Sequence, residues 1–145
     1  MNVIVTLTDA KLHEDAIHRG PAQMYPAVRE GIRGAFYAAK PFILEPVQTL
    51  LFEAPEEYVG ELSKIISNKR GQLLEMNQEG SIIQVKGKIP VAEMFGLANE
   101  LRSGTEGRGS SSVVDQNFER LPEELQRRVA DQIRTRKGLK TEESS

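Results

Sequence analysis

The chain has 145 residues, with 19 basic and 21 acidic side chains and a formal net charge of -2 at pH 7. This length allows one compact domain or two small ones and excludes a multi-domain enzyme, and the near-neutral charge restricts any nucleic-acid contact to a local patch. Because the sequence has no cysteine, disulfide bonds, thiolate catalysis, zinc fingers and iron–sulfur clusters are excluded.

The first third of the chain predicts a strand, a loop and a helix. Residues 2–12 show the period-two pattern of a β-branched strand, residues 13–21 are polar and end in Gly-Pro, and residues 23–40 carry apolar side chains at helical spacing. A strand that begins without a preceding turn resembles one taken from a larger sheet, so we expect its sheet partners to be missing. Its free edge could then pair with a second copy of the chain.

After Pro41 the pattern changes to a regular alternation of strands and helices. Strands are predicted over residues 46–53, 72–76, 81–89 and 111–118, and helices over residues 55–68 and 91–102. We expect Gly71 to cap the first helix and Gly80 to take a positive φ in a hairpin connection over residues 77–80. The order βαββαβ is that of the split βαβ, or ferredoxin-like, fold.

A further helix is predicted over residues 121–137, because Pro122 begins it and basic residues followed by Gly138 end it. The sequence therefore predicts an α+β protein in which a partial β-α element of a larger domain precedes a ferredoxin-like domain and a carboxyl-terminal helix. The expected parts are residues 1–41, 42–120 and 121–139, followed by a disordered tail over residues 140–145.

Both histidines of the chain, His13 and His18, lie in the polar loop. A metal site is not favoured, because a five-residue spacing matches no recurrent ligand pattern and no cysteine or third histidine completes the shell. A Ser-His-Asp triad is not favoured either, since the serines at 110–112 lack a nucleophile-elbow context. These residues alone do not distinguish a functional loop from an exposed connection whose histidines have no role.

A glycine-rich stretch over residues 104–109 invites comparison with a phosphate-binding loop. Such loops place their glycines at the amino terminus of a helix, whereas here the order is helix, glycines, strand. We therefore expect a flexible connection and no nucleotide hydrolysis by this route.

Basic side chains gather at three places along the chain. Two of the groups lie at predicted helix ends and are expected to be solvated or to complement helix dipoles. The first group differs, because Arg29 and Arg33 share a helix face next to the loop with Arg19, an arrangement suited to RNA phosphates. The groups are Arg19, Arg29, Arg33 and Lys40; Lys69 and Arg70; and Arg134, Arg136 and Lys137.

Residues 12–23, with the sequence Leu-His-Glu-Asp-Ala-Ile-His-Arg-Gly-Pro-Ala-Gln, closely resemble the tip of the fourth domain in the elongation factor 2 family of translocation GTPases. The resemblance continues through Pro26 and the helix, and residues 68–72 and 90–96 resemble the fifth domain of that family. Gly-Pro-Ala-Gln over residues 20–23 is similar to the archaeal form, because eukaryotic members usually carry Gly-Gly-Gly-Gln there.

This resemblance implies the ribosome-binding part of a factor that promotes GTP-dependent translocation of tRNA and mRNA in the cytoplasm. His18 would be the histidine converted to diphthamide, at a tip that enters the decoding centre of the small subunit. The ferredoxin-like part would lie near the GTPase centre of the large subunit. The residues expected to shape the loop for its modifying enzymes are His13, Asp15, Ile17, Arg19, Gly20 and Gln23.

The resemblance also implies that this chain is not itself an enzyme and needs no cofactor, since GTP and Mg²⁺ belong to a GTPase domain that it lacks. The expected partners are ribosomal RNA, the tRNA–mRNA pair in the decoding site and the diphthamide biosynthesis enzymes, with no membrane. An independent ferredoxin-like regulatory or ligand-binding module is the alternative, because this fold carries many functions.

Overall fold

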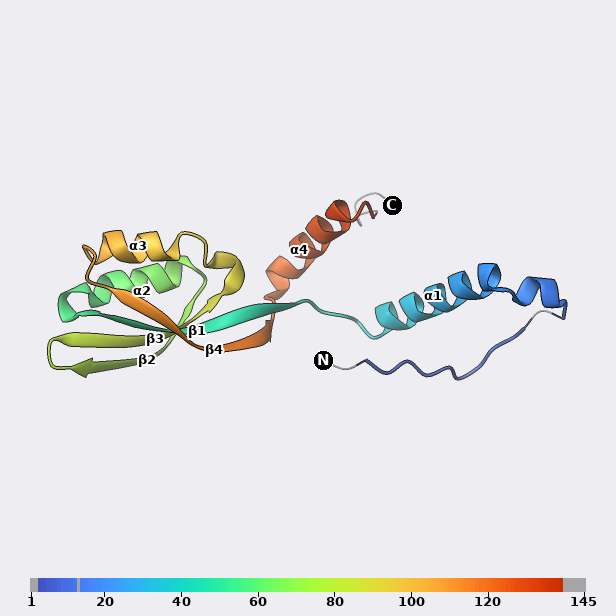
Figure 1. The fold of residues 1–145 in the computed structure, drawn as a ribbon, viewed down its shortest axis with the longest axis horizontal. Helices are drawn as coiled ribbons and strands as arrows, with labels where there is room; N and C mark the ends of the chain where they lie inside the picture. Colours follow the sequence, from blue (N-terminus) through green and yellow to red (C-terminus); the bar gives the residue numbers. More distant parts are fainter. Residues whose placement is uncertain (1–2, 13, 140–145) are drawn as a thin grey trace. The chain divides into compact units, whose positions relative to one another are not determined.

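The computed structural model describes residues 3–12 and 14–139. The chain divides into two compact units, Met1–Phe42 and Ile43–Ser145, which we call the amino-terminal unit and the sheet unit. Figure 1 shows the elements of each.

The amino-terminal unit holds a short 3-10 helix, η1 (Ala16–Arg19), and one α-helix, α1 (Pro21–Ala38). The strand predicted over residues 2–12 is wrong for its described part, residues 3–12, which contain no regular secondary structure. A strand is defined by hydrogen bonds to a neighbouring backbone, and no described strand pairs with this segment. Its apolar side chains, including Val3, Ile4 and Leu7, are therefore exposed.

Helix α1 begins at Pro21, two residues before the predicted start. Proline suits this first position because its fixed φ is already helical and its missing N–H would have no partner there. Pro26 consequently lies inside the helix rather than in its first turn, where it removes the hydrogen bond to the carbonyl of Ala22. No residue of α1 is buried.

The sheet unit confirms the βαββαβ order and the ferredoxin-like fold. Its four strands are antiparallel and stand in the order β2-β3-β1-β4, with α2 and α3 on one side of the sheet (Figure 1). The elements are β1 (Leu44–Pro55), η2 (Glu56–Tyr58), α2 (Val59–Asn68), β2 (Gln72–Glu79), β3 (Ile82–Pro90), η3 (Val91–Glu93), α3 (Leu97–Gly104), β4 (Ser110–Arg120) and α4 (Glu123–Arg136).

The hydrophobic core lies between the sheet and the helices α2 and α3. Alternate residues of β1 face it, because side chains of a strand point to opposite faces in turn. Phe52, which is fully buried, pairs in register with Val85 of the neighbouring strand. The other core residues are Leu50, Ala54, Leu62, Ile65, Ile66, Ile83, Ile89, Leu97 and Leu101.

The cap of α2 differs from the prediction. Arg70, and not Gly71, takes the left-handed conformation, with φ 51°. Gly71 follows it and donates its N–H to the carbonyl of Ile66 at 2.8 Å, which is the six-to-one hydrogen bond of a Schellman cap. Glycine is needed at 71 for space, since a Cβ there would lie 2.6 Å from the Ile66 oxygen and 2.9 Å from the Lys88 oxygen.

The helix predicted over residues 91–102 is also wrong in part, because it is broken in the structure. The 3-10 turn η3 ends at Glu93, and α3 begins only at Leu97. Between them Gly96 has φ 78°, a left-handed conformation that cannot continue a right-handed helix. Met94, on this connection, still packs against the core.

The hairpin prediction is confirmed at Gly80, whose φ is 64°. The connection is shorter than predicted, since β2 continues to Glu79 and β3 begins at Ile82. Only Gly80 and Ser81 remain between the strands, a loop length that favours a positive φ at its first residue.

Lys69 and Arg70 are held in ion pairs rather than simply solvated at a helix end. Arg70 contacts Glu45 of β1 at 3.0 Å and Glu93 of η3 at 2.9 Å. Hydrogen bonds to Glu45 and then to Glu93 raise the pKa of Arg70 above its ordinary value, although partial burial opposes this. Lys69 contacts Glu100 at 2.7 Å and donates to the carbonyl of Phe95 at 2.9 Å, so the two cations join the cap of α2 to three other elements.

The connection over residues 104–109 is more ordered than the expected flexible loop. Thr105, fully buried, donates its hydroxyl to the Leu101 carbonyl at 2.6 Å and accepts the Gly109 N–H at 2.8 Å. The N–H of Gly107 donates to the Arg102 carbonyl at 2.8 Å. These amides are used within the loop, so they are not arranged to receive a phosphate.

Replacing Thr105 with valine is expected to lower the free energy of unfolding of the sheet unit by about 1–3 kcal/mol, because the Gly109 N–H loses its acceptor at nearly unchanged side-chain volume. Urea denaturation followed by circular dichroism measures this. Thr105→Ser, which keeps the hydroxyl, should lose less. Equal losses in the two variants would show that the hydroxyl is not the stabilising group.

Candidate functional site: the histidine loop

The loop that precedes α1 is ordered by its own backbone. Asp15 is the N-cap of η1, and its carboxylate accepts the N–H of Ile17 at 3.2 Å. The carbonyl of Asp15 accepts the N–H of His18 at 3.1 Å. The first N–H groups of a helical turn have no hydrogen-bond partner within the turn, and a preceding carboxylate can accept from them. Asp15 therefore stabilises the turn that contains His18.

The side chains of this turn face solvent. Ile17 is 77% exposed, and His18 and Arg19 are also exposed. Arg19 reaches back to donate from Nη2 to the carbonyl of Glu14 at 3.5 Å. The turn therefore presents an apolar side chain, an imidazole and a guanidinium to solvent side by side in the sequence.

Gly20 joins the turn to α1 and is half-buried. Its carbonyl accepts the N–H groups of Gln23 and Met24, both at 3.0 Å, and begins the helix. A Cβ at Gly20 would lie 3.8 Å from Oε1 of Gln23, so the Gln23 side chain folds back toward the turn. Pro21 as the first helical residue was not predicted, although a proline after the loop glycine signals a helix start.

The structure brings together the predicted loop residues Asp15, Ile17, His18, Arg19, Gly20 and Gln23, which follow one another through η1 and the first turn of α1. His13 lies outside the described residues. The roles predicted for all seven loop residues remain predictions.

Arg29 and Arg33 lie farther along α1. From Pro21 a helical rise of 1.5 Å per residue places them about 12 and 18 Å along the axis. Arg33 contacts Glu30 at 3.0 Å, which compensates part of its charge. Arg19, in η1, and the two arginines of α1 are therefore spread along the chain rather than gathered in one compact patch.

Residues 3–12 and 14–139 hold neither a metal centre nor a membrane-spanning helix. Within them no group of three or more histidine, cysteine, aspartate or glutamate side chains could hold a metal ion. Of the helices in this described part, none combines the length and the apolar character that a membrane span requires.

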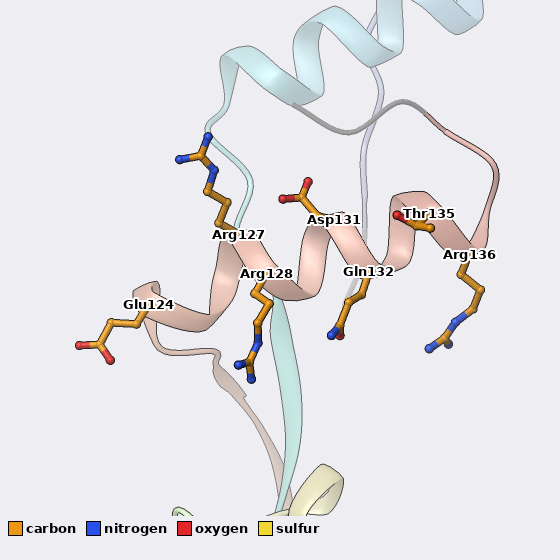
Figure 2. Close-up of a pocket in the computed structure, with 7 residues that line it drawn as sticks. All are labelled: Glu124, Arg127, Arg128, Asp131, Gln132, Thr135 and Arg136. Atoms are coloured by element: carbon orange, nitrogen blue, oxygen red, sulfur yellow. The ribbon is translucent and has the colours of Figure 1, made fainter. Parts of the chain in front are cut away.

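A hollow on the described surface runs along α4, and Figure 2 shows that all seven residues around it come from that one helix. Side chains from one helix diverge outward, so they do not enclose a ligand. The hollow also mixes charges, since Glu124 and Asp131 stand among Arg127, Arg128 and Arg136. Its geometry indicates no catalytic or cofactor site.

Comparison with known families gives two matches that meet near the boundary of the two units. The family described as "Elongation factor G, domain IV" matches residues 1–40. The family described as "Elongation factor G C-terminus" matches residues 42–139.

Three similar curated proteins are archaeal. Elongation factor 2 of Methanococcus maripaludis is 54% identical over 140 residues, covering 97% of this chain and 19% of that protein. Elongation factor 2 of Methanocaldococcus jannaschii is 51% identical over 140 residues, with the same coverage of 97% and 19%. That of Methanosphaera stadtmanae is 46% identical over 142 residues, covering 98% of this chain and 20% of that protein. The chain thus spans about a fifth of the length of these relatives.

A solved structure supports the same fold. The crystal structure of a protein from Thermus thermophilus is similar with a TM-score of 0.59 and 30% sequence identity, and the match covers 63% of this chain and 14% of that one.

Proposed function

Because the chain belongs to the family of elongation factors G and 2, we propose that it is the ribosome-binding part of an archaeal-type elongation factor 2. In this proposal the longer protein promotes translocation of tRNA and mRNA, and this chain contributes two of its contacts with the ribosome. The single observation that carries the proposal is the exposed, capped turn that contains His18.

The turn is suited to contact with RNA. His18 is exposed, so modifying enzymes can reach it, and its backbone is held by the Asp15 carbonyl at 3.1 Å. We propose that His18 is the residue converted to diphthamide, which adds a permanent positive charge beside Arg19. The diphthamide biosynthesis enzymes would then recognise the loop formed by Asp15, Ile17, Gly20 and Gln23, together with His13.

Arginine side chains recognise phosphates through their planar array of donors. Arg19 sits at the tip, and Arg29 follows on α1, where no ion pair with another described residue is found. We propose that Arg19 and Arg29, with a smaller contribution from the paired Arg33, contact the RNA backbone when the tip enters the decoding centre. Binding should then weaken as the salt concentration rises.

The sheet unit would lie near the GTPase centre of the large subunit. We propose that GTP hydrolysis with Mg²⁺ takes place in another part of the longer protein, and we propose no catalytic role for this chain. The longer protein would act in the cytoplasm. The alternative of an independent ferredoxin-like module has no support of its own, since both units match the same family.

Directed hydroxyl-radical probing tests this proposal. The natural sequence has no cysteine, so one introduced cysteine can carry a tethered iron chelate. With ribosomes bound, Ala22→Cys at the start of α1 is expected to cleave small-subunit RNA in the decoding centre, and Asn99→Cys on α3 to cleave large-subunit RNA. The unsubstituted chain, treated identically, is the control. Cleavage of neither RNA above this control would contradict ribosome binding, and decoding-centre cleavage from position 99 but not 22 would contradict the assigned orientation.

A further inference from the structure

The side chain of Gln126, in the first turns of α4, is bound to backbone that is 83 residues away in the sequence. Its Oε1 accepts the N–H of Ile43 at 2.7 Å, and its Nε2 donates to the Ile43 carbonyl at 3.2 Å. The same Nε2 donates to the Leu121 carbonyl at 2.6 Å. One amide group thus satisfies both backbone groups of Ile43, as a neighbouring strand would.

Leu121 completes this arrangement. Its N–H donates to the Ile43 carbonyl at 2.9 Å, one residue beyond the last ladder pair of β1 and β4, Leu44 with Arg120. Leu121 is only 3% exposed. The ladder between β1 and β4 is therefore extended by one residue, and Gln126 closes its end.

Ile43, which Gln126 holds, lies at the junction between the two units. Ile43 is the first residue of the sheet unit, directly after the boundary at Phe42. Before it, Lys40 has φ 52°, an uncommon conformation for a residue with a side chain, and Pro41 follows. The chain therefore passes from the end of α1 to the fixed backbone of Ile43 within a few residues.

We propose that Gln126 is a positioning residue that clamps Ile43 and confines movement between the two units to residues 39–42. Only one of the three hydrogen bonds, to Leu121, is local in the sequence, and the other two go to Ile43. The carboxyl-terminal helix thereby sets the length of the link to the amino-terminal unit. This inference goes beyond the proposed function and does not depend on it.

Two measurements on the full chain test the clamp in Gln126→Leu, which keeps the bulk of the side chain and removes all three hydrogen bonds. Amide hydrogen exchange at Ile43 is expected to become at least about fivefold faster, as for the loss of one net hydrogen bond. Exchange at Phe52 and Val85 in the core should not change. Spin labels on Ala27→Cys and Asn99→Cys should give a broader distance distribution between α1 and α3.

Gln132→Leu, the same substitution on an exposed part of α4, is the matched control and should change neither quantity. Gln126→Glu keeps the acceptor for the Ile43 N–H but loses the hydrogen bonds that Nε2 donates to Ile43 and Leu121. Its rate of exchange at Ile43 should therefore lie between the rates of the natural chain and Gln126→Leu.

Unchanged exchange at Ile43 in Gln126→Leu would overturn the clamp, and faster exchange without a broader distance distribution would overturn its effect on movement. Faster exchange at Phe52 and Val85 in both Gln126 variants would also overturn it, because Gln126 would then support the whole sheet unit. Since none of these measurements involves the ribosome, their failure would leave the proposed function untouched.

Discussion

Replacing Gly71 with alanine is expected to lower the free energy of unfolding of the sheet unit by about 3 kcal/mol, the upper range for overpacking a well-packed site. The added Cβ would lie 2.6 Å from the Ile66 oxygen, 2.7 Å from its Cγ2 and 2.9 Å from the Lys88 oxygen. Two of these atoms belong to the backbone, so no side-chain rotation relieves the contact. Ile66 is itself 1% exposed, and moving it would disturb the core.

Gly60→Ala provides the matched control for this prediction, because it is the same substitution within α2. Nothing lies within 4 Å of a Cβ at Gly60, and alanine is favoured over glycine in a helix by about 1 kcal/mol. We expect this variant to be stabilised where Gly71→Ala is destabilised. Denaturant unfolding of both chains measures the difference, and a Gly71→Ala chain as stable as the natural one would show that the α2 cap readily rearranges.

The order of elements in the sheet unit could be predicted from the sequence because each element has its own period. β1 carries apolar residues on both faces, as a central strand does, and its residues Leu50, Phe52 and Ala54 are buried. The helices α2 and α3 repeat their apolar residues at helical spacing, and Leu62 and Leu101 both reach the core. Local pattern and tertiary packing agree here, which is why the ferredoxin-like order was predictable.

The predicted cap of α2 and the predicted start of α3 were wrong, and a glycine lies at each. Glycine can be required for a positive φ or for the space that its missing Cβ leaves. At Gly96 the backbone turns left-handed and breaks a helix that its apolar spacing would have continued. At Gly71 the residue provides space, while the left-handed φ belongs to Arg70. Sequence shows that a glycine is present but not whether its φ or its missing Cβ is needed.

Long-range polar contacts could not be predicted for the same sheet unit. Arg70 binds Glu45, which is 25 residues earlier, and Lys69 binds the carbonyl of Phe95, 26 residues later. At the sequence level both cations are equally consistent with a helix dipole. Only the fold brings the carboxylates of Glu45 and Glu93 to one guanidinium.

The amino-terminal unit shows a different limit. Residues 3–12 have the pattern of a strand, yet a strand needs a partner that this pattern does not supply. The polar composition before Gly20-Pro21 predicts a loop but not the 3-10 turn η1, which Asp15 caps. The role proposed for His18 rests on the resemblance to the family and not on its spacing from His13.

His18→Ala and Arg19→Ala, introduced into the longer protein, are each expected to slow translocation by about tenfold or more. A hydrogen bond to a charged group contributes about 1.5–3 kcal/mol, and each variant removes one cationic or polar group from the exposed turn at the tip. Arg128→Ala on α4, which removes one cation from the sheet unit, is the matched control and should translocate normally.

The rate of a single round of translocation on archaeal ribosomes, followed in real time after addition of the longer protein and GTP, tests the central claim most directly. The account predicts slow translocation for both loop variants and the natural rate for Arg128→Ala. Translocation at the natural rate and accuracy by both His18→Ala and Arg19→Ala would contradict a role for this loop at the decoding centre.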